Sequence, residues 1–339
     1  MRILVTGGAG YVGSHVAAAL AAAGHGVVVL DDLSEGHRGA LEGFGASLVV
    51  GDIADPAVLD ACLEQGPVDG VVHMAASCLV GESMERPSRY FDNNVERSLR
   101  LLDHLAGRGV KRVVFSSTAA VYGEPDPRRG QGLDEDHPCE PTNVYGESKL
   151  MVERALDWLC RRAGFGAVAL RYFNAAGADP RSAMGEDHDP ETHLVPLVCR
   201  AALDGSPVTI LGRDYPTPDG TCLRDYVHVA DLASAHLLAL EALRRGASEG
   251  RLAVYNLGAQ QAVSVLEVVE AARRITARPI AVRDGPRRAG DPAVLRASST
   301  RIRRELGWKP AMSDLESILR TAWRWHAARP RGFDGPPPP

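Results

Sequence analysis

A glycine-rich segment near the start of the chain limits its fold more than any other feature. An apolar run at residues 2–6 predicts a short buried strand, and the segment Gly7–Gly13 that follows matches the pattern G-x-G-x-x-G. An alanine-rich helix is expected from about Tyr11 to Ala23. Glycines here allow backbone to approach a pyrophosphate, which the free N–H groups of the helix amino terminus can bind. Strand, glycines and helix predict a dinucleotide-binding α/β domain.

Two acidic residues indicate which dinucleotide is bound. A second apolar run at residues 27–30 ends in Asp31 and Asp32. An acid roughly 20 residues past the glycines suits the ribose hydroxyls of NAD. Two carboxylates would repel the 2′-phosphate of NADP. NAD is therefore the expected cofactor.

The alternation of strand and helix patterns predicts a Rossmann-like, doubly wound parallel sheet with helices on both faces. Further strands are expected at residues 47–50, 70–73, 112–116, 167–172, 208–211, 254–257 and 280–283. Further helices are expected at residues 56–64, 90–106, 144–163, 231–244, 264–276 and 314–327. We expect an NAD-binding domain at residues 1–174 and a smaller α/β substrate-binding lobe mainly at 175–330, between which the chain can cross. The tail at residues 331–339 is expected to be disordered.

Composition excludes several classes of protein. The net charge is −5, and the arginines at residues 283–304 are interleaved with acids, which argues against nucleic-acid binding. The six cysteines are scattered without a C-x-x-C pair, so we expect reduced thiols in the cytoplasm. No apolar stretch approaches the ~20 residues of a membrane span. His188 and His193 have acids nearby but form no compact ligand set in the sequence, so no metal site is expected.

A candidate proton-transfer pair lies in the helix expected at residues 144–163. Four-residue spacing places Tyr145 and Lys149 one turn apart on one face. A free tyrosine has a pKa of about 10, and a neighbouring ammonium together with a cationic nicotinamide would lower it. Thr118, at the end of the strand expected from residue 112, is the hydroxyl chosen to hydrogen-bond the reacting oxygen. Tyr145, Lys149 and Thr118 are therefore the candidate catalytic residues for hydride chemistry on an alcohol.

These motifs resemble the extended short-chain dehydrogenase/reductase family, and within it the branch that epimerises UDP-sugars at C4. The resemblance runs from Met1 to about Trp325 and includes segments outside the cofactor motif, such as 171–177, 224–228 and 286–291. It implies that Tyr145 takes the proton of the sugar O4 while NAD takes the C4 hydride. A 4-keto sugar then turns in the site, and the hydride returns to its other face. UDP-glucose and UDP-galactose are the implied substrates, and a homodimer is the implied assembly.

The resemblance also assigns binding residues. The implied cofactor-binding residues are Gly7, Gly10, Tyr11, Val12, Gly13, Asp31, Asp32, Asp52, Ile53, Met74, Ala75, Ala76, Asn93, Ser116, Tyr145, Lys149 and Tyr172. The implied substrate-binding residues are Thr118, Asn174, His193, Leu194, Arg224, Tyr226, Arg288, Asp291 and Leu295. Arginine forks suit a diphosphate, and carboxylates suit ribose hydroxyls.

Departures from the family pattern leave alternatives open. Cys78 stands where some members carry a lysine that helps to hold the cofactor, so weaker NAD retention is possible. Leu295 occupies a gate where tyrosine excludes N-acetylated sugars and smaller residues admit them, so UDP-N-acetylglucosamine stays an alternative substrate. UDP-pentoses and UDP-glucuronate also stay alternative substrates, because the sequence does not separate the 4-epimerases that act on them. A 4,6-dehydratase would carry acids after Thr118, where this chain has Ala119 and Ala120. A non-catalytic NAD-sensing regulator is the remote alternative, since it would not need the catalytic residues.

Overall fold

The computed structural model describes residues 1–125, 132–181, 183–248, 250–288 and 291–334, and within them seven strands form one parallel sheet. In spatial order the strands are β10 (Ala253–Leu257), β6 (Gly166–Tyr172), β5 (Arg112–Thr118), β4 (Gly70–His73), β1 (Arg2–Thr6), β2 (Gly26–Asp31) and β3 (Ser47–Val50). Each neighbouring pair is parallel. This order, which reverses direction beside β1, confirms the predicted doubly wound α/β fold.

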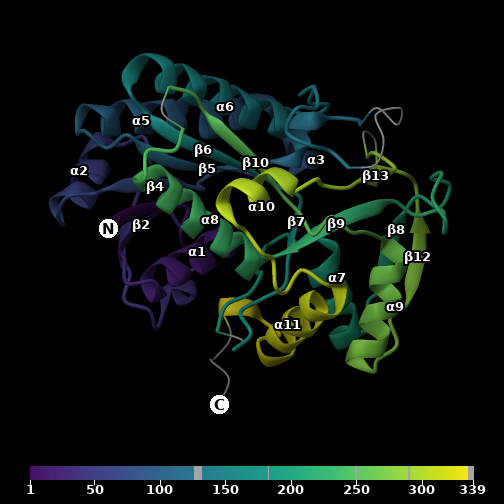
Figure 1. Cartoon of the computed structure of the whole chain (residues 1–339). Coiled ribbons are helices and arrows are strands. Elements are labelled where there is room, and N and C mark those ends of the chain that lie inside the picture. The colour runs from purple at the N-terminus through teal and green to yellow at the C-terminus, as the bar shows by residue number, and fades with distance from the viewer. Residues whose placement is uncertain (126–131, 182, 249, 289–290, 335–339) are drawn as a thin grey trace.

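Helices cover both faces of this sheet because alternate strand residues point to opposite sides. Ile3 and Val5 pack with α1 (Tyr11–Ala22) and α8 (Val229–Arg244). Leu4 packs on the other face with α2 (Pro56–Glu64) and α5 (Arg97–Gly107), and α6 (Val144–Ala163) continues that layer. Figure 1 shows α5 and α6 on one side of the sheet and α1 and α8 on the other.

The second lobe has its own apolar core between three helices. They are α7 (Leu194–Asp204), α9 (Val265–Thr276) and α11 (Leu315–Ala328). The strands of the lobe are β7 (Asn174–Ala176), β8 (Val208–Leu211), β9 (Leu223–His228), β11 (Ala262–Ser264), β12 (Val282–Gly285) and β13 (Val294–Leu295). β9 pairs with β7, β11 and β13, and β8 pairs with β12. The remaining short α-helices are α3 (Val80–Glu85), α4 (Pro87–Tyr90) and α10 (Thr300–Leu306). Part of the tail expected to be disordered is ordered, because the Phe333 ring packs 4.9 Å from the Trp325 ring and Gly332–Asp334 forms a 3₁₀ turn, whereas residues 335–339 lie outside the described residues. Sequence analysis did not predict α7, although its first turn borders the site described below.

The chain returns to the large domain after entering the second lobe. β10 lies beside β6 at the edge of the parallel sheet, and α8 packs against α1. Residues 175–330 therefore contribute to both parts, and β10 and α8 hold the lobe against the sheet.

The helix expected at residues 90–106 is interrupted, which corrects the sequence prediction. A π-helical turn, η2 (Phe91–Glu96), separates α4 from α5. The Asn94 side chain accepts a hydrogen bond from the Ser77 amide at 2.9 Å and donates to the Ser148 hydroxyl at 3.0 Å. These bonds to distant segments compensate for the irregular turn, a feature often found at functional sites.

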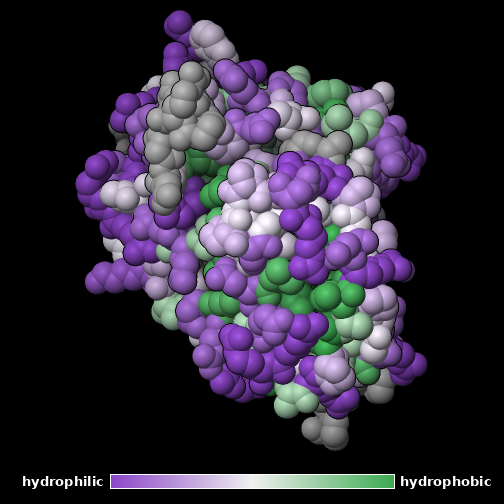
Figure 2. All heavy atoms as spheres, turned by 90° about the vertical axis from the view of Figure 1, so that its right-hand side faces the viewer, coloured by the Kyte–Doolittle hydropathy of each residue, from purple (hydrophilic) through white to green (hydrophobic). Residues whose placement is uncertain are grey.

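The side of the molecule that carries β8, β12 and α9 is largely hydrophilic, with hydrophobic groups gathered in a limited central and lower area (Figure 2). Within the described residues, each helix is too short or too polar to span a lipid bilayer.

Candidate active site

A cleft of about 1130 Å³ runs along the carboxyl ends of the parallel strands and continues against the second lobe. Single small ligands usually occupy roughly 300–1,000 Å³, so this cleft has room for a dinucleotide together with a second nucleotide. Every residue that the sequence analysis assigned to catalysis, cofactor or substrate lies along its wall. Sequence reasoning did not name Ser34, Glu35, Ser77 and Thr192, which also line it.

The glycine segment shapes one end of the cleft, and its glycines serve different purposes. Gly7 has a φ of +67°, and a β-carbon there would lie 2.6 Å from the Ala75 nitrogen. A β-carbon on Gly13 would lie 2.0 Å from the carbonyl oxygen of Gly7. Gly10 has an ordinary φ of −76°, and a β-carbon there would meet only the Gly7 oxygen, at 3.5 Å. Gly7 and Gly13 are thus required by the turn itself, whereas Gly10 keeps the cleft side open for close approach of a ligand.

Acidic residues stand at the ends of the next two strands. The Asp31 carboxylate accepts hydrogen bonds from the Ala9 and Leu33 amides, both at 2.9 Å, and burial raises its pKa. Asp32, beside it, accepts from the backbone and hydroxyl of Ser34. These carboxylates face a cleft bordered by a glycine turn and a helix amino terminus, a donor and acceptor set that fits NAD. Asp52 lies farther along and pairs with Arg97 at 2.5 Å.

His73 ends β4 but does not line the cleft. Its ring nitrogens lie 2.7 Å from the Thr6 hydroxyl and 2.8 Å from the Ser98 hydroxyl, beneath the cleft floor. Burial, and to a lesser extent the charge of Lys149, lowers its pKa to about 3, so the ring is neutral. His73 therefore joins β1, β4 and α5.

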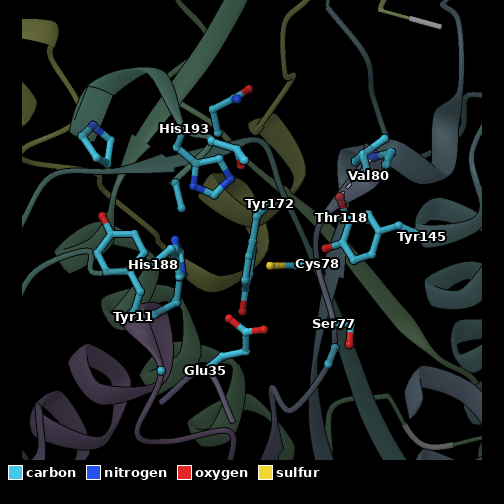
Figure 3. A pocket seen from close by; sticks show the side chains of 18 of the residues that line it. Tyr11, Glu35, Ser77, Cys78, Val80, Thr118, Tyr145, Tyr172, His188 and His193 are labelled. Atoms are coloured by element: carbon cyan, nitrogen blue, oxygen red, sulfur yellow. Dashed lines mark hydrogen bonds between the residues drawn. The ribbon is translucent and has the colours of Figure 1, made fainter. Parts of the chain in front are cut away.

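The proposed catalytic residues come together where β5 ends and α6 begins. The Asn143 side chain accepts a hydrogen bond from the Gly146 amide at 2.8 Å, so α6 starts immediately before Tyr145. A hydrogen bond links Thr118 to Tyr145. Lys149 Nζ donates to the Ser116 carbonyl at 2.9 Å. Figure 3 shows Thr118 and Tyr145 on one wall, opposite Tyr11, His188 and His193.

The expected lowering of the tyrosine pKa is not found in the protein alone. Burial raises the pKa of Tyr145, a negative charge on the nearby Cys78 would raise it further, and the hydrogen bond with Thr118 offsets only part of the effect of burial. Burial also lowers the pKa of Lys149 to about 8. The sequence prediction included the neighbouring ammonium and a cationic nicotinamide but not the loss of water around the phenolate, which is the largest effect in the protein alone.

Cys78 faces the catalytic residues from the loop after β4 (Figure 3). Solvent reaches its thiol inside the cleft. Enclosure by the protein walls nevertheless raises its pKa to about 11, so the thiol is neutral at pH 7.

A buried polar network behind the catalytic residues was not predicted. Glu153 on α6 forms two hydrogen bonds with Arg171 on β6, at 2.9 and 2.6 Å, and accepts a third from Ser117 at 2.5 Å. Arg171 also donates to the Tyr122 hydroxyl, which donates to Asn256 on β10. A charged residue in the otherwise apolar strand at 166–172 was the available sequence signal. The network fixes β5, β6 and α6 relative to one another.

The other end of the cleft carries arginines. Arg224 on β9 is buried, donates to the Pro292 carbonyl at 2.9 Å and lies 3.2 Å from Asp291. The atom nearest Asp291 is Nη2, which forms this ion pair but makes no hydrogen bond among the described residues. Arg288 is exposed at the rim, and Leu295 pairs with Arg224 in the β-ladder. A buried guanidinium with an unused donor suits a phosphate oxygen.

Four residues between β7 and α7 form a compact set of possible metal ligands, contrary to the sequence expectation. One ligand atom from each of Glu186, His188, Glu191 and His193 lies within 4.8 Å of the others. The sequence could not indicate this set because the loop must fold back on itself to bring the four side chains together.

Comparison with known proteins identifies the family of the chain. Residues 3–258 match the NAD dependent epimerase/dehydratase family. The chain belongs to this family. The matched region of the epimerase/dehydratase fold contains every assigned residue except Arg288, Asp291 and Leu295.

Individual relatives cover nearly the whole chain. UDP-glucose 4-epimerase of Lacticaseibacillus casei is 49% identical over 98% of this chain and 99% of its own length. The structure of UDP-glucose 4-epimerase from Brucella ovis in complex with NAD is 43% identical with a TM-score of 0.90, covering 95% of this chain and 97% of the other. The structure of UDP-glucose 4-epimerase from Bifidobacterium longum in complex with NAD⁺ and UDP is 34% identical with a TM-score of 0.91, and the match covers 98% of this chain and 100% of the other.

Proposed function

We propose that this chain is an NAD-dependent 4-epimerase of UDP-sugars, an isomerase that interconverts UDP-glucose and UDP-galactose. The observation that carries the proposal is one cleft that joins the glycine turn, the Tyr145–Lys149–Thr118 group and the arginines of the second lobe. The similar proteins named UDP-glucose 4-epimerase support the same substrate.

NAD would be held by the glycine turn and by Asp31, with Lys149 close to the nicotinamide ribose. When bound, it supplies the acceptor and donor of the hydride at the sugar C4. The open side of Gly10 and the carboxylates at the end of β2 support this assignment.

Tyr145 is the proposed acid and base. As a phenolate it takes the proton from the sugar O4, and as the resulting phenol it returns that proton to the same oxygen after the face of the sugar has changed. Thr118, hydrogen-bonded to Tyr145, orients the phenol and the O4. Because burial raises the pKa of Tyr145, the phenolate needs positive charge beside it, which Lys149 on the next turn of α6 would supply together with the bound cofactor.

The second lobe would hold the UDP portion while the sugar turns. Arg224 and Arg288 would bind the diphosphate, and Asp291 would accept from the uridine ribose. Tyr226 and Leu194 would border the nucleotide, with His193 beside them at the start of α7 and Asn174 on β7. This arrangement fixes the nucleotide and leaves the hexose end free to rotate.

Epimerisation is preferred over elimination because Ala119 and Ala120 follow Thr118 on the cleft wall. A dehydratase would need an acid and a base beside C5 and C6, and methyl groups cannot transfer protons. UDP-N-acetylhexosamines are the second candidate substrates, since Leu295 is smaller than tyrosine and lies partly buried at the cleft edge.

We further propose a homodimer through the layer formed by η2, α5 and α6. Exposed apolar side chains gather there: Phe91, Leu99, Met151 and Trp158. Patches of this kind mark protein interfaces. Sedimentation at twice the mass of the chain would support this assembly. The six free cysteines suit the reducing cytoplasm that we propose as its compartment.

The proposed reaction is tested by incubating purified protein, without added cofactor, with UDP-galactose and separately with UDP-N-acetylgalactosamine. Chromatography then quantifies the C4 epimers. Conversion of UDP-galactose is expected. No conversion of either substrate after NAD is supplied would reject the hexose assignment and direct attention to pentoses or uronates.

A further inference from the structure

We propose that Glu186, His188, Glu191 and His193 form a binding site for a divalent transition-metal ion, with Zn²⁺ as the preferred ion. The inference does not rest on the epimerase reaction. It concerns the loop before α7, which lies on the cleft wall opposite Tyr145, where Figure 3 shows His188 and His193 side by side.

The four ligand atoms have the spacing that a small metal site needs. His188 Nδ1 lies 3.3 Å from Glu186 Oε1 and 3.9 Å from Glu191 Oε2. His193 Nδ1 contacts the same Glu186 oxygen, and one ligand atom from each of the four residues lies within 4.8 Å of the other three. Tetrahedral Zn²⁺ with ligands at about 2.1 Å requires ligand atoms roughly 3.4 Å apart. Ligation would therefore need shifts of about 1 Å, chiefly to replace the His193–Glu186 contact.

One carboxylate oxygen of the set, Glu191 Oε2, makes no hydrogen bond among the described residues and has only the distant His188 Nδ1, at 3.9 Å, beside it. Both glutamates are enclosed, with side chains that are 3% exposed for Glu186 and 1% exposed for Glu191. Glu191 Oε1 accepts from the backbone amides of Thr192 and His193, at 2.7 and 2.8 Å. Oε2 of Glu191 is buried and has no hydrogen-bond partner among the described residues. Burying a carboxylate oxygen without a partner is costly, and a metal ion in this set would remove that cost.

The chemistry of the ligands selects the ion. Two imidazole nitrogens and two carboxylate oxygens suit Zn²⁺ and similar transition metals, whereas Mg²⁺ and Ca²⁺ prefer oxygen ligands alone. The two carboxylates would balance the charge of the dication. Because each histidine would ligate through Nδ1, its Nε2 would stay available to a hydrogen-bond partner.

The proposal is tested by calorimetric titration of chelator-treated protein with ZnCl2. The protein without substitutions is expected to bind one Zn²⁺ ion per chain. The Glu191→Gln variant should bind at least about tenfold more weakly, since even partners behind a metal ligand contribute this much. The Asp189→Asn variant makes the same loss of charge at an exposed position of the same loop, and should bind as the unchanged protein does.

A second variant distinguishes loss of Zn²⁺ binding from loss of the native fold. His193 has a side chain that is 47% exposed, so His193→Gln should keep the native circular dichroism spectrum while Zn²⁺ affinity falls at least about tenfold. Co²⁺ absorption provides a readout independent of activity, because thiolate ligation adds an intense charge-transfer band that nitrogen and oxygen ligands lack. Absence of stoichiometric Zn²⁺ binding, unchanged affinity in both variants, or a thiolate band would each overturn the site.

Discussion

Lys149 on α6 donates a hydrogen bond from Nζ to the carbonyl oxygen of Ser116 on β5, 2.9 Å away. The ammonium also lies 4.9 Å from the centre of the Phe115 ring. These contacts hold a cation in a buried place, at the point where the helix that carries Tyr145 meets the parallel sheet. Burial consequently lowers the pKa of Lys149 to about 8, because the charged ammonium is less stable in this place than it is in water.

The lowered pKa of Lys149 predicts a rise in stability at alkaline pH. Between about 8 and 10.5 the unfolded chain binds a proton at Lys149 that the folded protein does not, so the free energy of unfolding rises with pH across this window. Relative to Lys149→Met, which has no such group, the rise should approach ~3 kcal/mol. Urea unfolding of both cofactor-free proteins at pH 8, 9 and 10 measures it. Parallel pH curves would contradict the prediction.

Tyr145→Phe should abolish turnover without loss of the fold. The substitution removes the hydroxyl that carries the proton and keeps the ring in its buried place. Loss of a general acid and base typically lowers a rate by about 10²–10⁴-fold. Initial rates with UDP-galactose measure this, and the NAD content of the purified variant, expected to be unchanged, is the control. Near-normal activity would show that another group moves the proton.

Gly10→Ala and Gly13→Ala should separate ligand binding from folding. A β-carbon on Gly10 meets only the Gly7 oxygen at 3.5 Å, so this variant should keep its melting temperature but bind NAD at least about tenfold more weakly. A β-carbon on Gly13 overlaps the Gly7 carbonyl oxygen, so that variant should lose more than ~2 kcal/mol of stability. Thermal melts and NAD titrations of the pair measure both effects. Equal behaviour of the two variants would refute the distinction.

Leu295→Tyr should change the choice of substrate. The side chain lies at the cleft edge beside Arg224 in the β-ladder, where a larger ring would reduce the room for an N-acetyl group. Any activity on UDP-N-acetylgalactosamine should fall at least about tenfold more than activity on UDP-galactose, as expected when a bulky group fills a pocket. The ratio of kcat/KM for the two substrates is the measurement. Equal losses on both substrates would remove Leu295 as a gate.

The sequence alone was sufficient for most of the parallel sheet and its turns. The strand at residues 70–73 and the helix at 56–64 have the predicted limits, because apolar runs and caps act among neighbours in the chain. The glycine spacing and the Tyr145–Lys149 spacing are local in the same way. The binding residues around these two motifs were implied by the resemblance to a known family, and the structure places them along one cleft.

Other features depended on packing between distant segments. The π-helical turn at Phe91–Glu96 follows from hydrogen bonds of Asn94 to Ser77 and Ser148, and the Glu153–Arg171 pair joins a helix to a strand. No periodicity in the sequence encodes such partners.

Sequence by itself determined the fold class and the cofactor type, because spacing and side-chain chemistry are written along the chain, and the resemblance to a known family implied most of the residues assigned to the cleft. Only the tertiary structure decided the charge states and the clustering within the cleft. Burial, which raises the pKa of Tyr145, depends on the protein packed around the phenol. The meeting of Glu186 and Glu191 with two histidines depends equally on how the loop folds back. Desolvation and proximity are properties of three-dimensional surroundings, so they emerge only when the chain has folded.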